Sequence, residues 1–426
     1  MLDIAIIDGT RTPFAKAFGP LAGVSARTLG RTVTTALLQR TDLKPDRVDQ
    51  VVFGNVATPA DAANIARVIA LESGIPQDRI AHTVQRNCAS GMEAITTAAQ
   101  LIQLGEAKTI VAGGTESMSQ VPLLYSAEAT ERFLQLGRAR SWWQRLTALL
   151  RLRPRHFKPI PALQLGLTDP VSGLIMGATA EVLAREFNVT RTEQDEYALE
   201  SHRRASAAQE RCVLSEEMSP VPLDTGEVLK TDVGPRKDQS LAALAKLRPF
   251  FQEDGTVTVG NSCSITDGAA AVLLMPGETA RAEGRKPLGY LRGYAYAGCD
   301  PRRMGLGPAY ATHKLLQRVG LSMKDIDLVE MNEAFAAQII ANERAFASKE
   351  FAEKELGRTE ALGTLDRQRM NVNGGAIALG HPVGATGTRL AITLLKELRR
   401  RGQRRGLATL CVGGGQGGAM LLETGD

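Results

Sequence analysis

Short apolar runs alternate with amphipathic stretches in both the first and the last part of the chain. Residues 3 to 8 form an apolar run that predicts a buried strand, and residues 27 to 39 place their apolar positions at helical spacing. Strands that alternate with helices indicate an α/β protein in which mostly parallel strands are covered by helices and joined by right-handed crossovers. In such folds, ligand sites lie beyond the carboxyl ends of the strands.

The order of these elements occurs twice. Residues 43 to 55 and residues 321 to 333 both consist of a turn, a helix start and a strand, in register at an offset of 278 residues. Residues 83 to 114 and residues 371 to 415 both contain a loop, an apolar helix, a strand and a glycine turn. The sequence therefore predicts a duplicated fold.

A proline-rich region separates the two copies and breaks their pattern. It shows little strand signal and one clear predicted helix, over residues 191 to 211. We therefore predict an N-terminal half, an insertion and a C-terminal half. The boundaries are 1–118 plus 243–276, then 119–242, then 277–426.

The composition indicates a globular protein. The chain has 426 residues, of which 43% are hydrophobic, enough for sizeable cores. Its five cysteines are odd in number and lack metal-ligand spacing, which favours a reducing compartment over a disulfide framework. The N-terminus has no signal-peptide pattern and no apolar run is long enough to span a membrane, so we expect a cytoplasmic protein. Nothing in the sequence indicates a nucleic-acid partner.

The net charge of +5 is unevenly distributed. Residues 133 to 168 contain seven Arg and Lys residues and no acidic residue. Two interpretations remain open: a surface helix whose apolar side lies on the core, or a docking helix within 138–158 for an anionic membrane or a partner subunit. The helix pattern itself comprises Trp142, Trp143, Leu146, Leu149 and Leu150, flanked by Arg145 and Arg151.

Residues suited to covalent chemistry follow the predicted strands. Cys88 precedes a helix whose N-terminus would stabilise its thiolate, and His381 lies in a stretch with five glycines that leads into another helix. Cys411 ends an apolar strand and is followed by glycines whose amides suit an oxyanion site. Each cysteine on its own is also typical of an inert buried residue. Together they suggest a covalent step paired with a separate acid/base step.

Several longer stretches resemble the thiolase family, the acetyl-CoA acyltransferases, over essentially the whole chain. The resemblance implies two βαβαβαββ halves that form a layered αβαβα core, with an inserted loop domain that binds coenzyme A (CoA). The matching stretches are Arg11–Pro13, Asn87–Ala94, Ala112–Met118, Met176–Glu181, Gly255–Thr258, Thr266–Gly268, Asn332–Phe335, Gly380–Pro382 and Cys411–Gly415.

The resemblance also implies roles for five catalytic residues. Cys88 is similar to the acyl-accepting nucleophile and His381 to the base that activates it. Cys411 is similar to the acid/base that acts on the acetyl methyl carbon. One oxyanion hole would comprise His381 and a water held by Asn332, and the other the backbone amides of Cys88 and Gly413.

No permanently bound cofactor or metal is expected, since CoA and acyl-CoA are substrates. This chain departs from the family at Cys263 and Ala243, where a small hydroxyl residue is usual. Plain packing remains the alternative role for each CoA-contact residue. The six CoA-contact positions implied by the resemblance are Met176, Arg236, Phe251, Cys263, Met304 and Phe335.

The chain is most similar to the β-subunit type of thiolase in fatty-acid oxidation complexes, notably over 136–161, 246–250 and 287–292. Ile175, where biosynthetic members commonly have His, also favours the degradative branch, whereas Asn332 replaces a His common in the β-subunit group. The predicted activity is thiolytic cleavage of 3-ketoacyl-CoA to acetyl-CoA and a shortened acyl-CoA, by a reversible Claisen reaction.

Three alternatives remain. A short-chain acetyl-CoA C-acetyltransferase would make or cleave acetoacetyl-CoA, and a non-catalytic acyl-CoA-binding subunit would use the fold alone. A ketoacyl synthase would lack a cysteine in the final glycine strand, so Cys411 argues against it. The resemblance implies a homodimer or homotetramer and a hydratase/dehydrogenase α-subunit as partner.

Overall fold

The computed structural model describes residues 1 to 425 and divides into two compact units. The large unit comprises Met1–Ser119 and Asp169–Asp426, and the small unit comprises Gln120–Thr168.

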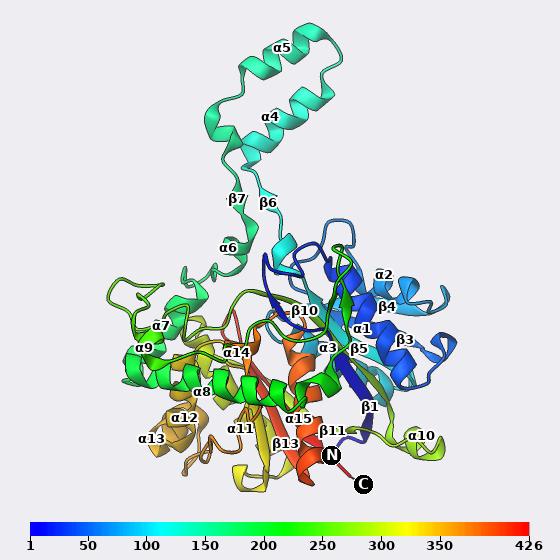
Figure 1. Cartoon of the computed structure of the whole chain (residues 1–426), viewed down its shortest axis with the longest axis vertical. Helices are drawn as coiled ribbons and strands as arrows, with labels where there is room; N and C mark the ends of the chain where they lie inside the picture. Colours follow the sequence, from blue (N-terminus) through cyan, green and yellow to red (C-terminus); the bar gives the residue numbers. More distant parts are fainter. Residues whose placement is uncertain (426) are drawn as a thin grey trace. The chain divides into compact units, whose positions relative to one another are not determined.

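The large unit is built on one 10-stranded sheet, with the strand order β12-β13-β14-β11-β1-β10-β5-β3-β4 and β2 paired to β10 (Figure 1). In the N-terminal half of the sheet, β3 pairs in parallel with both β4 and β5. The strands are β1 (Ile4–Arg11), β2 (Ala15–Lys16), β3 (Gln50–Gly54), β4 (Ile80–Val84), β5 (Ile110–Glu116), β10 (Thr266–Pro276), β11 (Gly289–Gly298), β12 (Leu328–Met331), β13 (Arg405–Val412) and β14 (Gln416–Glu423).

The two halves of the sheet meet at a short antiparallel pairing, in which Ile4–Ile6 of β1 face Gly289–Leu291 of β11. The expectation of mostly parallel strands is wrong, because β1, β10, β11 and β14 pair with their neighbouring strands in the antiparallel direction. The physical reason is visible at β13 and β14, which are joined by a tight turn and therefore must run in opposite directions.

Helices α3 (Ser90–Gln103) and α15 (Thr386–Arg401) form the middle layer. Their buried residues share one apolar cluster with strands from both halves of the sheet. The outer face of the N-terminal half carries α1 (Ala26–Arg40) and α2 (Ile65–Glu72). The outer face of the C-terminal half carries α11 (Gly307–Val319) and α12 (Ala336–Ala347). This gives the layered αβαβα arrangement expected from the sequence.

Equivalent hydrogen bonds confirm the internal duplication. Asp49 Oδ2 accepts bonds from the backbone amides of residues 108 and 109, just before β5, at 2.8 and 2.9 Å. Asp327 Oδ2 accepts bonds from the amides of residues 404 and 405, at the start of β13, at 3.0 and 2.8 Å. The two aspartates are 278 positions apart, so the offset seen in the sequence corresponds to one local structure built twice.

The predicted insertion contains more helices than the two expected. The helix predicted over 191 to 211 is α8 (Arg191–Glu210), but several shorter helices precede it. Short helices give little periodic signal, so only the longest helix and the amphipathic helix around residues 142 to 150 were recognisable. The other helices of the large unit are α7 (Met176–Glu186), α9 (Leu241–Ala245), α10 (Gly277–Ala282), α13 (Lys349–Leu356) and α14 (Ala376–Leu379); the unit also has a small hairpin of β8 (Val221–Pro222) and β9 (Val228–Leu229).

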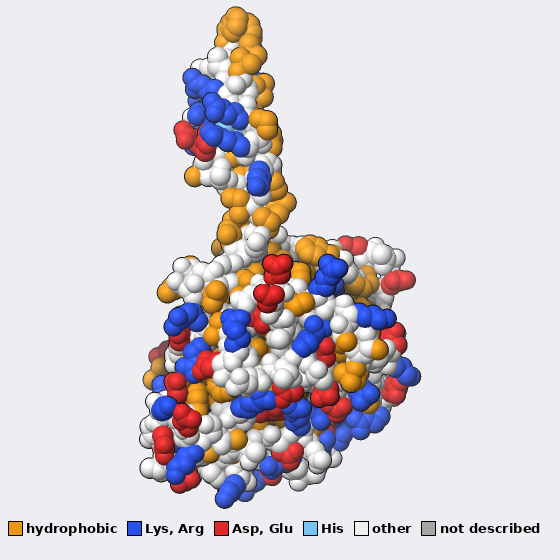
Figure 2. All heavy atoms as spheres, turned by 90° about the vertical axis from the view of Figure 1, so that its left-hand side faces the viewer, with side chains coloured by type: hydrophobic (Ala, Val, Ile, Leu, Met, Phe, Trp, Pro, Cys, Tyr) orange, Lys and Arg blue, Asp and Glu red, His pale blue; other side chains and the backbone are white. Residues whose placement is uncertain are grey.

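The small unit is a helical hairpin closed by two short strands. Strand β6 (Leu123–Leu124) pairs with β7 (Ile160–Pro161), and α4 (Ala127–Arg138) and α5 (Trp142–Leu150) lie between them in sequence. Helix α5 confirms the helix predicted there and buries none of its residues. Basic side chains gather on one flank of this unit and hydrophobic side chains along its edge and tip (Figure 2). No helix within residues 1–425 is long and apolar enough to cross a membrane.

Candidate functional site

The loop that carries Cys88 and the loop that carries His381 meet where α3 and α15 begin. Cys88 lies two residues before α3, and His381 lies five residues before α15. The Thr388 hydroxyl donates to the carbonyl oxygen of Gly91 at 3.0 Å. The two helix N-termini are therefore packed together, which brings the nucleophile and base candidates to one place.

The His381 ring has one bonded nitrogen and one free nitrogen. Its Nδ1 lies 2.6 Å from Thr386 Oγ1, and the Thr386 hydroxyl donates to the carbonyl oxygen of Pro382 at 3.0 Å. Since the hydroxyl hydrogen is used there, the Thr386 oxygen accepts from Nδ1–H, and the ring proton is assigned to Nδ1. Nε2 is buried and has no hydrogen-bond partner within residues 1–425, so its lone pair is free to take a proton.

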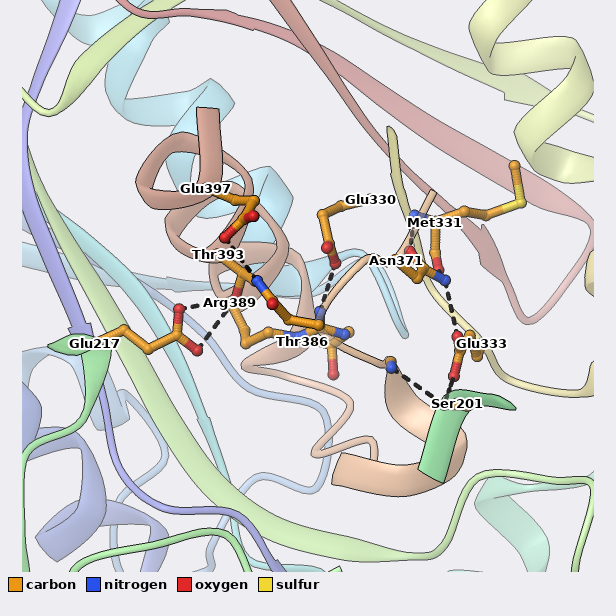
Figure 3. Close-up of polar contacts among 12 residues, drawn as sticks. Ser201, Glu217, Glu330, Met331, Glu333, Asn371, Thr386, Arg389, Thr393 and Glu397 are labelled. Atoms are coloured by element: carbon orange, nitrogen blue, oxygen red, sulfur yellow. Dashed lines mark hydrogen bonds and ion pairs between the residues drawn. The ribbon is translucent and has the colours of Figure 1, made fainter. Parts of the chain in front are cut away.

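His381 is uncharged at neutral pH. Burial, and then the nearby Arg389 charge, lower the pKa of His381 from 6.5 to about 3. Arg389 is itself fully buried and pairs with Glu330, with Nη1 and Oε2 2.9 Å apart (Figure 3). The imidazole is thus held neutral, the state required of a base.

The Cys88 thiol is partly buried, and its pKa is raised above 9.0. Burial is the main cause, while the backbone amides of Gly413 and of Cys88 itself act in the opposite direction and the Glu116 charge raises it further. The expected stabilisation of the thiolate by the helix N-terminus is therefore outweighed by burial. The resting pair is a neutral thiol and a neutral imidazole.

A glycine turn positions the Gly413 amide against Cys88. Gly414 and Gly415, between β13 and β14, have φ angles of +86° and +77°, a region that favours glycine. The side-chain amide of Asn87 donates to the Gly413 carbonyl oxygen at 2.8 Å, which fixes the peptide plane beside the sulfur. Two backbone N–H groups, of Cys88 and Gly413, thus act on one sulfur atom.

Three thiols influence one another at this site. Cys411, the penultimate residue of β13, is fully buried, and its pKa is raised well above 9.0 by burial and by charge on Cys88 and Cys263. Burial and the neighbouring Cys88 raise the pKa of Cys263 to about 12. Cys411 and Cys263 therefore remain protonated, and Cys411 has a proton to give.

Asn332 has a buried side chain with unused hydrogen-bonding groups. It directly follows β12, and its backbone amide donates to the Thr409 carbonyl oxygen of β13 at 3.0 Å, two residues before Cys411. Both its Nδ2 and its Oδ1 are buried without a protein partner among residues 1–425. Such a group calls for a bound water or substrate.

The next residue, Glu333, is fixed by several donors (Figure 3). Its two carboxylate oxygens accept bonds from Tyr197 at 3.0 Å, Ser201 at 2.7 Å and Asn371 at 2.9 Å. Asn371 Oδ1 also accepts a hydrogen bond from the Met331 amide at 2.9 Å, so the residues on both sides of Asn332 are held by hydrogen bonds.

Four of the CoA-contact candidates share one apolar cluster with Cys411. Met304 and Phe335 are buried in it, and Met176 and Phe251 pack against it. The rings of Phe251 and Phe335 meet edge to face with centroids 6.0 Å apart.

Cys263 joins the Asn332 loop through its backbone, which donates to the Ala334 carbonyl oxygen at 3.0 Å. Arg236 is exposed, and its backbone amide donates to His202 Nδ1 at 3.2 Å. Ala243 lies on α9, where its amide is capped by Ser240. Within residues 1–425, no group of three or more His, Cys, Asp or Glu side chains could hold a metal ion.

Sequence reasoning missed Thr386, the Asn87 side chain and the Glu333 network. The sequence did contain a signal for Thr386, because it is a hydroxyl residue five positions after His381, where the following helix begins. The contacts of Asn87 with Gly413 and of Glu333 with Ser201 join segments more than a hundred residues apart and leave no local pattern.

The fold and this arrangement of thiols, a neutral imidazole and paired backbone amides define an acyltransferase. The model of the thiolase N-terminal domain matches residues 4–278, and that of the thiolase C-terminal domain matches residues 285–424. The chain belongs to the thiolase family, as predicted.

Relatives and solved structures cover the chain almost completely. It is 43% identical over 424 residues to a 3-ketoacyl-CoA thiolase of Pectobacterium carotovorum, covering 99% of this chain and 96% of the relative. It is 42% identical over 423 residues, with the same coverage, to that of Serratia proteamaculans.

The acetyl-CoA acetyltransferase structure of Bacillus anthracis has a TM-score of 0.87 at 38% identity and 99% coverage of both chains. Human mitochondrial 3-ketoacyl-CoA thiolase has a TM-score of 0.87 at 36% identity, again with 99% coverage of both chains. Its complex with CoA has a TM-score of 0.86 at 36% identity, covering 99% of this chain and 98% of that one. These similarities confirm the predicted fold class.

Proposed function

We propose that the protein cleaves 3-ketoacyl-CoA with free CoA, giving acetyl-CoA and a shortened acyl-CoA, in the degradation of fatty acids. The observation that carries this function is the neutral His381, whose Nε2 has no partner among residues 1–425 and belongs to a loop packed against the start of the Cys88 helix. The activity agrees with the names of the relatives.

In the first half-reaction, Cys88 attacks the ketone carbon of the substrate as its proton passes to His381 Nε2. A sulfur–carbon bond forms, and the bond between the α- and β-carbons then breaks. The departing electron pair becomes the enolate of acetyl-CoA. Cys411 donates its proton to this carbon, which releases acetyl-CoA and leaves an acyl-enzyme on Cys88.

Two sets of donors stabilise the negative oxygen atoms. The amides of Cys88 and Gly413 serve the attacked ketone oxygen. The protonated Nε2 of His381, with a water held by the otherwise unpartnered Asn332 amide, serves the enolate oxygen. The backbone amides of Cys88 and Gly413 are in place before substrate binds, which reduces the reorganisation needed in the transition state.

In the second half-reaction, the thiol of free CoA attacks the acyl-enzyme carbonyl. The Cys411 thiolate takes the proton of the CoA thiol, the thioester to Cys88 breaks as His381 returns its proton to the Cys88 sulfur, and the shortened acyl-CoA leaves. This order predicts ping-pong kinetics.

The apolar cluster of Met176, Phe251, Met304 and Phe335 is proposed to line the pantetheine arm of CoA, beside Cys263. Arg236, exposed and positively charged, would contact the nucleotide end. The predicted insertion 119–242 would thus supply Met176 and Arg236 to the CoA site, between the halves 1–118 plus 243–276 and 277–426.

A short-chain acetyltransferase is the second candidate, because the Bacillus anthracis structure with that name matches over 99% of the chain. A thiolysis assay with 3-ketoacyl-CoA substrates from four to sixteen carbons separates the two. We expect activity on long chains, and the same assay on Cys88→Ala should show none. Activity restricted to acetoacetyl-CoA would favour the second candidate, and full activity of Cys88→Ala would overturn the mechanism.

For its assembly, we propose a homodimer or homotetramer in the cytoplasm. Support comes from β4, which forms the open edge of the sheet and has no fully buried residue, so it can pair with a second copy. The exposed basic and apolar surface within 138–158 is proposed to contact an anionic membrane or a hydratase/dehydrogenase subunit.

A further inference from the structure

A polar pocket lies in the large unit at the C-terminal ends of α1 and α15. It has a volume of about 380 Å³, and five of its nine lining residues are basic while one is acidic. The small unit carries eight basic and two acidic residues, so the rest of the chain has a formal charge of only −1. The five cations are therefore concentrated rather than part of a generally basic surface. The lining comprises Ile7, Asp8, Arg40, Thr41, Arg285, Lys286, Leu288, Lys396 and Arg399.

One carboxylate is shared by two of the cations. Asp8 Oδ2 lies 3.1 Å from Arg40 Nε, and Asp8 Oδ1 lies 3.6 Å from Lys396 Nζ. Arg285 pairs with Glu283, outside the pocket, at 2.8 Å.

The other two cations lack an acidic partner. Arg399 donates to the Pro287 carbonyl oxygen, and neither Arg399 nor Lys286 forms an ion pair within residues 1–425. Positive charge in the pocket thus exceeds the charge available to neutralise it.

Helix dipoles explain only part of this cluster. Arg40 and Arg399 lie in the last turns of α1 and α15, where cations are favoured without any ligand. Lys396 lies five residues before the end of α15, and its side chain is only 13% exposed. Arg285 follows α10 and is 19% exposed. Gathering partly buried cations is unfavourable unless an anion occupies the space between them.

We propose that this pocket binds a nucleoside diphosphate group, either free or as the nucleotide end of a CoA molecule. Arg399, Lys286 and Lys396 would bind the phosphates, where guanidinium groups can make paired hydrogen bonds. The Asp8 carboxylate would accept a hydrogen bond from a ribose hydroxyl, and the apolar side chains of Ile7 and Leu288 would contact the base.

This pocket is separate from the thiol site. Lys396 is ten residues beyond Thr386 on the same helix, which corresponds to about 15 Å along its axis. The two sites lie towards opposite ends of α15, so binding in the pocket does not depend on the proposed catalytic function.

Isothermal titration of the full-length protein with pyrophosphate, ADP and 3′-phospho-ADP tests the proposal. We expect binding to wild type, weakened about tenfold or more in Lys396→Gln/Arg399→Gln, with thiolysis unchanged. Tighter binding of ADP than of 3′-phospho-ADP would identify a free nucleotide, and the reverse order would identify the CoA end.

The control variant Lys349→Gln/Lys354→Gln removes two positive charges from an exposed surface on α13. It should bind these ligands as tightly as wild type does. Circular dichroism establishes that each variant is folded, and the single exposed change Lys286→Gln provides a milder second test. Absence of binding to wild type overturns the proposal. Equal binding by the pocket variants, or equal loss in the α13 control, overturns it as well.

Discussion

His381 Nδ1 lies 2.6 Å from Thr386 Oγ1, and this bond determines which ring nitrogen is free. The hydroxyl belongs to the first residue of α15, so the helix that begins beside the site also orients its base. Because Nε2 has no partner among residues 1–425, the orientation of the ring depends on this one side-chain contact.

Thr386→Val should slow formation of the acyl-enzyme by roughly tenfold to a hundredfold, because the ring loses its fixed tautomer and direction. Thr386→Ser keeps the hydroxyl and should stay close to wild type. Rapid-quench mass spectrometry of Cys88 acylation measures both. Equal rates for the valine and serine variants would contradict this role.

The depressed pKa of His381 makes the folded state sensitive to acid. Between its folded value of about 3 and its ordinary value of 6.5, the unfolded chain binds a proton that the folded chain does not. This contribution to stability is complete above pH 6.5 and is lost as the pH falls towards 3. From pH 7 to pH 5 the loss should be about 2 kcal/mol.

Urea unfolding at both pH values, at one protein concentration, measures this loss. His381→Asn lacks the titrating group, so its free energy of unfolding should change less between pH 7 and pH 5, by about 2 kcal/mol. An identical change in both proteins would show that His381 does not contribute.

Cys411→Ser should separate the two chemical steps. A serine hydroxyl is a far weaker acid than a thiol, so cleavage of the carbon–carbon bond should fall by about a hundredfold or more. Acylation of Cys88 by a simple acyl-CoA should survive, since it needs no proton transfer at carbon. The assignment fails if both rates fall equally.

Asn332→Ala should lower turnover without loss of fold. Its side-chain amide makes no protein hydrogen bond within residues 1–425, so its removal breaks no structural contact. Loss of one oxyanion donor costs roughly 3 to 4 kcal/mol at the transition state. The exchange of acetyl-CoA methyl protons with solvent reports the enolate directly, and an unchanged exchange rate would argue against this role.

The tryptophans of α5 should contribute to membrane binding. Trp142 and Trp143 are 61% and 60% exposed, and their rings stack with centroids 3.4 Å apart. Co-sedimentation with anionic vesicles should show weak binding that falls with salt and with Trp142→Ala/Trp143→Ala, while thiolysis of short substrates is retained. A parallel pull-down tests binding to the partner subunit. Absence of binding in both assays would indicate that α5 is an ordinary surface helix.

Local sequence patterns were sufficient to predict the duplicated architecture. The turn before β3 and the turn before β12 have the same sequence order, and the bonds of Asp49 and Asp327 show why. Strand direction was not accessible in the same way, because the pairing of β1 with β10 joins residues more than 250 positions apart.

The protonation states of the site residues could not be predicted from the sequence either. The position of Cys88 before a helix predicted a stabilised thiolate, but burial depends on the packing of α3 against α15 and reversed that balance. The free Nε2 of His381 likewise follows from three-dimensional contacts with Thr386 and Pro382.

The elevated pKa values of Cys88, Cys263 and Cys411 also bear on oxidative damage. Peroxide and alkylating agents react with thiolates, and the susceptibility of a cysteine follows its thiolate fraction and its exposure. All three sulfur atoms are protonated at neutral pH, and Cys411 is fully buried. We therefore expect the resting enzyme to resist peroxide, and its nucleophile to stay protected during turnover as well, because the Cys88 sulfur is bonded to carbon while His381 holds its proton.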